Sequence, residues 1–499
     1  MAEGVGIYFQ DHRESNDLGR LALRGGVISL ALQYGNGALQ ITAAIILARL
    51  LAPEDFGLVA IVTVLTSFAP LLIDFGLLDA TTQRATITPG QVSGLFWVST
   101  GIGVAVAVVV AACGPLIASL YDEPRLQPIA LCTAMTFVLS GVSNQHMALL
   151  RRAMRFGKIG QIQFLGTLAG IVVAVVLAMR GHGYWALVLR PFTNSFCVVV
   201  LAWTACPWRP GAPTFDDDVK SMIRFGLHIV GFTVTYTLSR AVDRIALGWF
   251  CRTEQVGYFQ NAVNLYENSI MTALNQMHAV GSVALRRLQS NPAALRQKYE
   301  AALSTLAFFA MPLAAILSVT AEDLTVILLG EKWRVAGSLL TIIALRGIFD
   351  VVEGSQGWLH LATGSADRWR NWGIISLVAQ SVAVLAGLPY GPTGVATATV
   401  VANMLIALPS VTYAGRPIGI GAALVIRAVG PQLIGAVSAV VLGWWLQAAF
   451  LGDYSGFIRI LVSGGLCAWI YLVIVVGLFR LSEPIRVAGR IVKDLMWKR

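Results

Sequence analysis

The sequence predicts an all-α integral membrane protein of about 14 transmembrane helices, built as two six-helix lobes followed by two extra C-terminal helices. Composition predicts the class: 56% of the 499 residues are hydrophobic and 12% are charged, whereas a soluble domain has about 25% charged residues. A mean hydropathy of +0.71 also favours a chain that lies in a bilayer. A repeat within the sequence predicts the two lobes.

The expected helices are the apolar stretches, taken in order along the chain. A spanning helix needs about 20 mostly apolar residues. Such stretches lie at residues 25–48, 57–78, 93–117, 128–150, 161–179, 183–205, 221–248, 256–284, 301–320, 336–362, 373–390, 393–414, 428–450 and 456–479. We group them as an N-lobe at 1–214, a C-lobe at 215–416, and two final spans with a cytoplasmic tail at 417–499.

The repeat is clearest at the turn after the first span of each lobe. The stretch LARLLAPEDFGLVAI begins at residue 47, and LGWFCRTEQVGYFQN begins at residue 247. The two copies share a glutamate and a glycine at the same places: Glu54, Gly57, Glu254 and Gly257. The match keeps its direction after six spans, which predicts parallel repeats about an axis normal to the membrane. Transporters with such repeats carry substrate between the halves.

We interpret this turn as a structural feature of the fold. A carboxylate at the start of a helix complements the helix dipole, and Thr253 is a residue type that caps helices. We expect Gly57 and Gly257 to let the two helices of each hairpin approach closely.

The cations predict the orientation of the chain. A net charge of +10 is compatible with nucleic-acid binding, but most lysines and arginines lie in alternate loops, as the positive-inside rule requires of a membrane protein. These loops contain Arg151, Arg152, Arg155, Lys158, Arg286, Arg287, Arg296 and Lys298. We therefore expect a multi-pass protein of the inner (plasma) membrane with both termini in the cytoplasm, and no nucleic-acid partner.

The remaining sequence features exclude several kinds of site. Residues 1–20 are polar and form no cleavable signal, so the first span is the expected targeting signal. The tail at 478–499 alternates cations with apolar residues, which predicts an amphipathic helix on the membrane surface or a docking segment for a partner. The cysteines lack metal-binding spacing, and no catalytic or cofactor motif occurs. We expect no catalytic residue, metal or cofactor.

Polar residues form stripes on four of the expected spans. On the eighth span they share one face at about 100° per residue, and they are Asn261, Asn264, Asn268, Thr272 and Asn275, with Glu267 and His278 beside them. Similar stripes on the second, seventh and tenth spans contain Thr63, Thr66, Ser67, Asp74, Arg240, Asp243, Arg244, Arg346, Asp350, Glu353 and His360.

Two interpretations of these stripes remain open. Buried polar groups in membranes often satisfy one another, and the candidates for such self-neutralising sets are Arg346 with Asp350, and Asp243 with Arg240 and Arg244. Alternatively, ionisable residues inside a membrane line a water-filled path. Because stripes occur in both repeats, we favour a shared polar lumen.

Longer segments of the chain resemble a known transporter family. The segments LARLLAPEDFGLVAIVTVLTSFAPLLIDFGL, YDEPRLQPIALC, RRAMRFGKIGQIQ, FGLHIVGFTVTYTLSRAVDRIALGWF and LLGEKWRVAGSLLTIIALRG are similar to polysaccharide flippases of the Wzx type, most of all to the colanic-acid-exporter branch. These proteins belong to the superfamily of multidrug, oligosaccharidyl-lipid and polysaccharide exporters. The resemblance implies two six-helix lobes around a cavity. It also implies a cargo, an oligosaccharide repeat unit on undecaprenyl pyrophosphate, that moves from the cytoplasmic to the periplasmic leaflet.

This cargo suggests roles for the polar residues. The paired hydrogen bonds of arginine suit pyrophosphate, so the candidates for that group are Arg24, Arg240, Arg244 and Arg346. Asparagine both donates and accepts, so the glycan is assigned to Asn261, Asn264, Asn268, Thr272 and Asn275. The candidates for ion coupling are Asp74, Asp243, Glu267, Asp350 and Glu353. Arg24 also fits the positive-inside rule alone.

Other functions remain as alternatives. A membrane polymerase or acyltransferase needs catalytic groups on the outer face, where the expected loops are short and lack a nucleophile–base pair. A multidrug antiporter of the same superfamily favours an acidic, aromatic cavity. A channel or scramblase is compatible with the same composition. The expected partners are the lipid-linked oligosaccharide, membrane lipids, and the polymerase or export machinery of the polysaccharide.

Overall fold

The computed structural model describes most of the chain and contains helices but no strand in that part. It covers residues 9, 18–67, 69–74, 81–82, 87–214, 242–272, 274–275, 277–278, 285, 291–481, 484 and 486, with the side chains of 18–31, 70, 71, 74 and 366 left out. The chain divides into two compact units, Met1–Gly257 and Tyr258–Arg499. This division follows packing density, and the repeat-based division at 214 and 416 stays a prediction.

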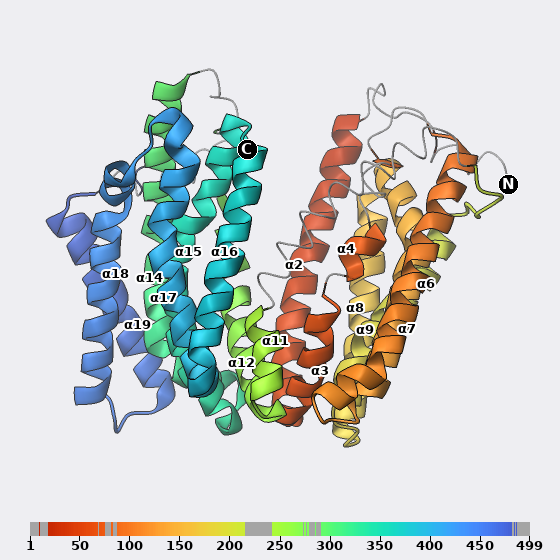
Figure 1. Cartoon of the computed structure of the whole chain (residues 1–499), viewed down its shortest axis with the longest axis horizontal. Coiled ribbons are helices and arrows are strands. Elements are labelled where there is room, and N and C mark those ends of the chain that lie inside the picture. The colour runs from red at the N-terminus through yellow and green to blue at the C-terminus, as the bar shows by residue number, and fades with distance from the viewer. Residues whose placement is uncertain are drawn as a thin grey trace. The chain divides into compact units, whose positions relative to one another are not determined.

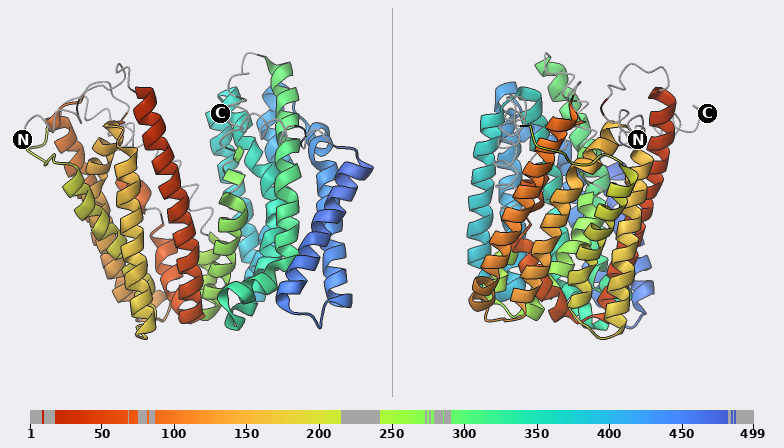
Figure 2. Two further views of the ribbon diagram at one scale, coloured as in Figure 1. Left: turned by 180° about the vertical axis from the view of Figure 1, so that it is seen from behind. Right: turned by 90° about the vertical axis from the view of Figure 1, so that its right-hand side faces the viewer.

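The helices of the first unit run side by side along a common direction (Figures 1 and 2). They are α2 (Leu18–Leu50), α3 (Pro53–Leu65), α4 (Ala69–Asp74), α6 (Pro89–Leu120), α7 (Leu126–Arg152), α8 (Phe156–Met179), α9 (Trp185–Ala205) and α11 (Val242–Phe250). Helix α12 (Thr253–Tyr266) begins in this unit and continues into the second.

The second unit contains long α-helices and several short 3-10 and π-helical segments. They are the π-helix η2 (Glu267–Met271), α14 (Pro292–Leu329), η3 (Glu331–Trp333), α15 (Arg334–Thr363), α16 (Ala366–Gly387), η4 (Leu388–Tyr390), α17 (Gly391–Gly415), η5 (Arg416–Ile418), α18 (Ala422–Phe450), α19 (Gly456–Leu472) and the π-helix η6 (Val473–Leu478).

The described part of the chain has nine helical stretches that are long and apolar enough to cross a membrane. They are Pro89–Leu120, Leu126–Arg152, Phe156–Met179, Trp185–Ala205, Pro292–Leu329, Glu331–Thr363, Asp367–Ile418, Ala422–Phe450 and Gly456–Leu478. Asp367–Ile418 contains both α16 and α17 and so covers two expected spans. The chain is therefore a multi-pass membrane protein, while the count of fourteen spans stays a prediction.

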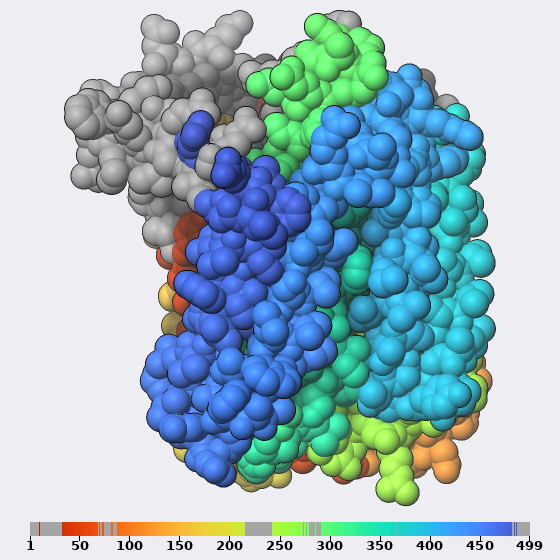
Figure 3. Space-filling model, turned by 90° about the vertical axis from the view of Figure 1, so that its left-hand side faces the viewer, coloured from red at the N-terminus to blue at the C-terminus, as the bar shows by residue number. Residues whose placement is uncertain are grey.

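Helix α14 is the centre of packing in the second unit, where it contacts α15, α18 and α19. On its buried face, Asp323 is 4% exposed and accepts a hydrogen bond from Gln447 of α18 at 2.9 Å. The same carboxylate forms an ion pair with Arg459 of α19. Because a buried charge must be paired, this cluster holds the two extra C-terminal helices against the unit. Figure 3 shows the face that α18 and α19 form, in blue.

The turn that revealed the repeat is capped in the same way in both copies. The backbone N–H of Ala52 donates to Asp55 Oδ2 at 3.0 Å, and the N–H of Arg252 donates to Gln255 Oε1 at 3.2 Å. In each copy the third helical residue thus reaches back to the residue that precedes the helix. Thr253 is the first residue of α12, and Gln255 supplies the cap that we expected from Thr253.

Gly57 and Gly257 have a different partner from the expected one. A Cβ atom on Gly57 would overlap the carbonyl of Thr253, and a Cβ on Gly257 would overlap the carbonyl of Pro53. The glycines therefore permit a close crossing of α3 with the start of α12, the equivalent helix of the other repeat.

The turn between the third and fourth expected spans of each repeat is a second repeated feature. Arg125, which precedes α7, aligns with Arg334, which begins α15. Each guanidinium pairs with two carboxylates, those of Glu54 and Glu123 in the first copy and of Glu322 and Glu331 in the second. The hydrogen bond from Arg125 lowers the pKa of Glu123. These partly exposed pairs fix the turns and add little stability each.

The glycine crossing predicts a large effect of one methyl group. We expect Gly57→Ala to lower the thermal unfolding temperature of the purified protein and its level in membranes, because overpacking against backbone costs about 1–3 kcal/mol. Gly101→Ala is the matched control, since no atom lies within 4 Å of a Cβ there. Equal stability of the two variants would show that the crossing is not a close contact.

The charge distribution predicts the orientation. A reporter enzyme that is active only outside the cytoplasm should be active when fused after Asp122 or Asp453, and inactive after Arg155 or Arg296, because the cation-rich loops stay inside. The activity of the four fusions, corrected for protein level, is the measurement. The reverse pattern would contradict the orientation.

Candidate functional site

The second helix of each repeat leaves α-helical geometry at the same place. In the first unit α3 ends at Leu65, and Thr66 and Ser67 follow in a turn. In the second unit α12 ends at Tyr266, and the π-helix η2 follows. These positions align in the repeat found from the sequence. Interrupted helices at corresponding positions of two halves mark the substrate site in transporters of this architecture.

The expected second span, residues 57–78, is not one continuous helix, and two hydroxyl groups explain why α3 ends. Thr66 Oγ1 donates to the carbonyl of Val62 at 2.8 Å, and Ser67 Oγ donates to the carbonyl of Val64 at 2.8 Å. Such hydroxyls compete with the backbone for its own acceptors and end or bend the helix. The chain then resumes as α4 at Ala69.

Neutral amides surround this interruption. Asn144 of α7 donates to the carbonyl of Ile73 at 3.4 Å. Its neighbour Gln145 is 0% exposed and accepts from Thr81 Oγ1 at 2.9 Å. By the alignment that pairs Arg125 with Arg334, the place of Asp350 is taken by Gly141 in the first repeat. The first unit therefore has a glycine where the second has a carboxylate, and its neutral amides follow three and four residues later.

The π-helix changes which residues of the predicted stripe share a face. The backbone N–H of Thr272 reaches back five residues to the carbonyl of Glu267. The sequence pattern assumed an α-helix throughout, and the structure divides the stripe. Asn261 is buried, and Asn264 is half-buried and accepts from Gln260 at 2.8 Å.

The open part of the stripe begins inside the π-helix. The exposed members are Asn268, Thr272 and Asn275, whereas Leu274 beside them is 1% exposed. The structure thus brings three of the five predicted glycan residues to one accessible polar face. Single π-turns within α-helices are frequent at functional sites.

A buried carboxylate lies against the same helix. Asp350 of α15 is 6% exposed and accepts three hydrogen bonds. Tyr266 donates to Oδ2 at 2.5 Å, Asn403 of α17 donates to Oδ1 at 3.1 Å, and Arg346 Nε lies 3.2 Å from Oδ2. Gln380 of α16 donates in turn to Asn403. The structure shows Arg346 paired with Asp350 on α15 and adds side chains from three further helices, α12, α16 and α17.

The sequence pattern missed Tyr266, Gln380 and Asn403. Tyr266 lies between Leu265 and Glu267 at the end of α12 and is not a member of the asparagine stripe, and Asn403 is a single amide in the apolar helix α17. A polar residue without a stripe gives no periodic signal, so only the meeting of four helices identifies these groups. Their one sequence signal is that each is a hydrogen-bonding side chain inside an expected span.

The other candidate residues lie in several places. Arg244 lies 3.6 Å from Asp243 in α11, and Glu353 is half-buried and accepts from Ser376 at 3.4 Å. Glu267 is half-buried at the start of η2. The side chains of Arg24 and Asp74 and the whole of Arg240 lie outside the described residues.

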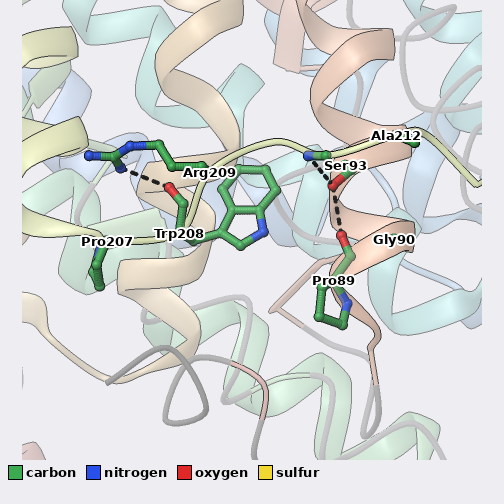
Figure 4. Close-up of a pocket in the computed structure, with 8 residues that line it drawn as sticks. Pro89, Gly90, Ser93, Pro207, Trp208, Arg209 and Ala212 are labelled. Atoms are coloured by element: carbon green, nitrogen blue, oxygen red, sulfur yellow. Dashed lines mark hydrogen bonds between the residues drawn. The ribbon is translucent and has the colours of Figure 1, made fainter. Parts of the chain in front are cut away.

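The described part of the chain also has a pocket of about 350 Å³ in the first unit, lined by Ser93, Trp208 and Arg209 among others (Figure 4). Arg209 donates there to the carbonyls of Trp203, Cys206 and Trp208, which end helix α9. Because its guanidinium already caps the helix, and no predicted site residue lines the pocket, we do not assign the site to it.

The arrangement in the second unit can bind polar and anionic groups. Exposed amides and a hydroxyl donate to and accept from hydroxyl-rich ligands. The side chain of Arg346 is 24% exposed, so its guanidinium is oriented by Asp350 and still meets solvent. The described residues of this site are thus groups that bind polar and anionic ligands.

The divided stripe predicts a pattern of chemical accessibility. In a background without the six native cysteines, single cysteines at Asn268, Thr272 and Asn275 should react with a water-soluble thiol reagent, because these side chains are exposed. Cysteines at Asn261 and Leu274 should react at least about tenfold more slowly, since buried thiols meet neither water nor reagent. Equal rates at all five positions would contradict the exposed face.

Comparisons with known proteins agree with the predicted family. Residues 46–337, more than half of the chain, match the model of a family described as polysaccharide biosynthesis protein. The lipopolysaccharide biosynthesis protein WzxC of Escherichia coli (strain K12) is 26% identical over 68% of this chain and 69% of its own length. The teichuronic acid biosynthesis protein TuaB of Bacillus subtilis (strain 168) is 23% identical over 65% of this chain and 68% of its own.

A solved structure shares the fold. The lipid II flippase MurJ in an inward closed conformation has a TM-score of 0.71 and 13% sequence identity, and the match covers 91% of this chain and 99% of MurJ. At this identity the likeness shows the fold alone. The family match and the similarity to WzxC show that the chain belongs to the polysaccharide biosynthesis protein family, as a Wzx-type flippase related to WzxC and not an enzyme.

Proposed function

We propose that this protein moves an undecaprenyl-pyrophosphate-linked oligosaccharide repeat unit from the cytoplasmic to the periplasmic leaflet of the inner membrane, for lipopolysaccharide or exopolysaccharide biosynthesis. The family membership supports a lipid-linked saccharide as cargo. WzxC and TuaB are named for different polysaccharides, so the relatives support the class of cargo and leave its sugars open.

The observation that carries this proposal is the departure from α-helical geometry at corresponding positions of the two repeats, a break after Leu65 and a π-turn after Tyr266. A continuous helix satisfies its own backbone groups, and a membrane tolerates an interruption only where protein or a watery cavity replaces those bonds. In the second unit the π-turn lies beside the exposed amides of Asn268 and Asn275. A glycan needs such a polar path through the bilayer.

We assign the binding roles by chemistry. Asn268, Thr272 and Asn275 contact the glycan, and the buried Asn261 and half-buried Asn264 support that face. Arg346 contacts the pyrophosphate, because a guanidinium forms paired hydrogen bonds with phosphate oxygens. Arg24, Arg240 and Arg244 are further candidates for the same anion.

Transport by alternating access then requires the lobes at 1–214 and 215–416 to expose this path to one side at a time. A carboxylate that exchanges a proton or cation offers a means of coupling, and the candidates are Asp74, Asp243, Glu267, Asp350 and Glu353. Asp350 is the best placed of them, since it holds Arg346.

Depletion of the protein tests the function. In cells with a repressible copy of the gene, we expect surface polysaccharide to fall and lipid-linked repeat units to accumulate in the inner leaflet. An impermeant glycan-cleaving enzyme added to spheroplasts should fail to cleave them, and should cleave them when wild-type protein is restored. Accumulated units that are cleaved without the protein would contradict flipping.

The same strain tests Arg346. We expect Arg346→Gln to lower surface polysaccharide at least about tenfold, the effect of about 1.4 kcal/mol, because glutamine keeps a hydrogen-bonding side chain and loses the charge that pyrophosphate needs. Arg334→Gln, which removes the half-exposed cation of a turn, is the matched control. Normal export by a membrane-inserted Arg346→Gln variant would show that the guanidinium is structural. Unchanged drug sensitivity in all strains is expected and would oppose the multidrug alternative.

A further inference from the structure

The hydrogen bond between Tyr266 and Asp350 lies where α12 changes from α-helical to π-helical geometry. Tyr266 is the last residue of α12 and is 2% exposed. Its hydroxyl donates to Asp350 Oδ2 at 2.5 Å, and the acceptor is 6% exposed. A hydrogen bond to a charged acceptor, shielded from water, is among the stronger ones in proteins. This hydrogen bond anchors the start of the π-turn to α15.

Two further contacts anchor the residues that follow Tyr266 in the sequence. Ile270, inside the π-turn, is 2% exposed and fits against Gly347, whose added Cβ would come within 3.3 Å of it. Further on, Trp358 Nε1 donates to the carbonyl of His278 at 3.0 Å. The segment from Tyr266 to His278 is thus held to α15 at both ends.

A π-turn absorbs one residue more than an α-helix would place between the same two anchors. Each residue of an α-helix adds about 100° of rotation. Suppose that the turn relaxed to α-helical geometry while the residues before it stayed in place. The residues after the turn would then rotate by about one residue position around the helix axis. Met271 and Leu274 would then take the places of Thr272 and Asn275.

We propose that Tyr266 is a positioning residue: through its hydrogen bond to Asp350 it holds the π-turn, and the π-turn keeps Thr272 and Asn275 on the open face of the eighth span. The statement that this face meets a glycan rests on the proposed function. The geometry itself does not, because it concerns which side chains are exposed. Apolar Leu274 would otherwise stand where a hydroxyl-rich ligand needs an amide.

The test measures accessibility in the full-length protein in its native membrane. Single cysteines at Leu274 and Asn275 are placed in the cysteine-free background, and their rates with a water-soluble thiol reagent are compared. In the otherwise wild-type chain, position 275 should react at least about tenfold faster than 274, the ratio of about 1.4 kcal/mol in accessibility. Tyr266→Phe removes one hydroxyl and should reverse this order.

A deletion supplies the test that a purely structural role would not pass. Removing Ser269, an exposed residue of the π-turn, takes out the surplus residue. In the Tyr266→Phe chain this deletion should restore the faster reaction at position 275, and surface polysaccharide with it. Asn403→Leu is the matched control: it removes another donor to Asp350 and leaves the bond from Tyr266, so the order should stay as in wild type.

Each outcome of the cysteine experiment supports or overturns the role proposed for Tyr266. An unchanged order in Tyr266→Phe, or a reversed order that deletion of Ser269 does not restore, would overturn the proposal. If Tyr266→Phe does not accumulate, deletion of Ser269 alone decides: the order should stay as in wild type, and a reversal would overturn the proposal. If the order reverses as expected while depletion leaves polysaccharide export intact, the proposed function fails and this inference stands.

Discussion

A buried carboxylate in a bilayer must be satisfied by protein groups, and Asp350 is the group on which the second unit depends. Neither lipid nor bulk water competes for its lone pairs, so its bonds are worth more than they would be at a surface. The donors come from α12, α15 and α17, and Gln380 of α16 supports one of them. One charge thus orients four helices, and it also fixes the arginine that we assign to an anionic ligand.

The same constraint recurs wherever the structure holds charge. Asp323 binds Arg459 and Gln447 and so attaches the two extra helices, whereas the paired arginines at Arg125 and Arg334 stay at half-exposed turns. The repeats are therefore alike in their turns and different at their centres. A glycine stands in the first repeat where Asp350 stands in the second, which is what an asymmetric cargo with one charged end and one neutral end would use.

The two helix interruptions connect this electrostatic arrangement to function. In the first unit hydroxyls of Thr66 and Ser67 take up backbone carbonyls, and in the second a π-turn follows Tyr266. Both solutions keep the freed backbone groups bonded inside the membrane. They differ because the second is tied to a charged side chain, so a change at Asp350 reaches the polar face of the eighth span directly.

The sequence by itself determined the class of fold, the repeat and most helix positions, because apolar length and local spacing are properties of single segments. It left open whether Arg346 and Asp350 pair with each other. It did not determine the interruption at Thr66, the π-turn at Glu267, or the burial of Asn261, since each depends on what the neighbouring helix offers. The sequence placed Gly57 correctly at a close helix contact but assigned the wrong partner helix. A glycine indicates that another backbone comes close, and it does not indicate which one. Tyr266 and Asn403 gain their meaning only where four helices meet, and that meeting is decided by tertiary packing.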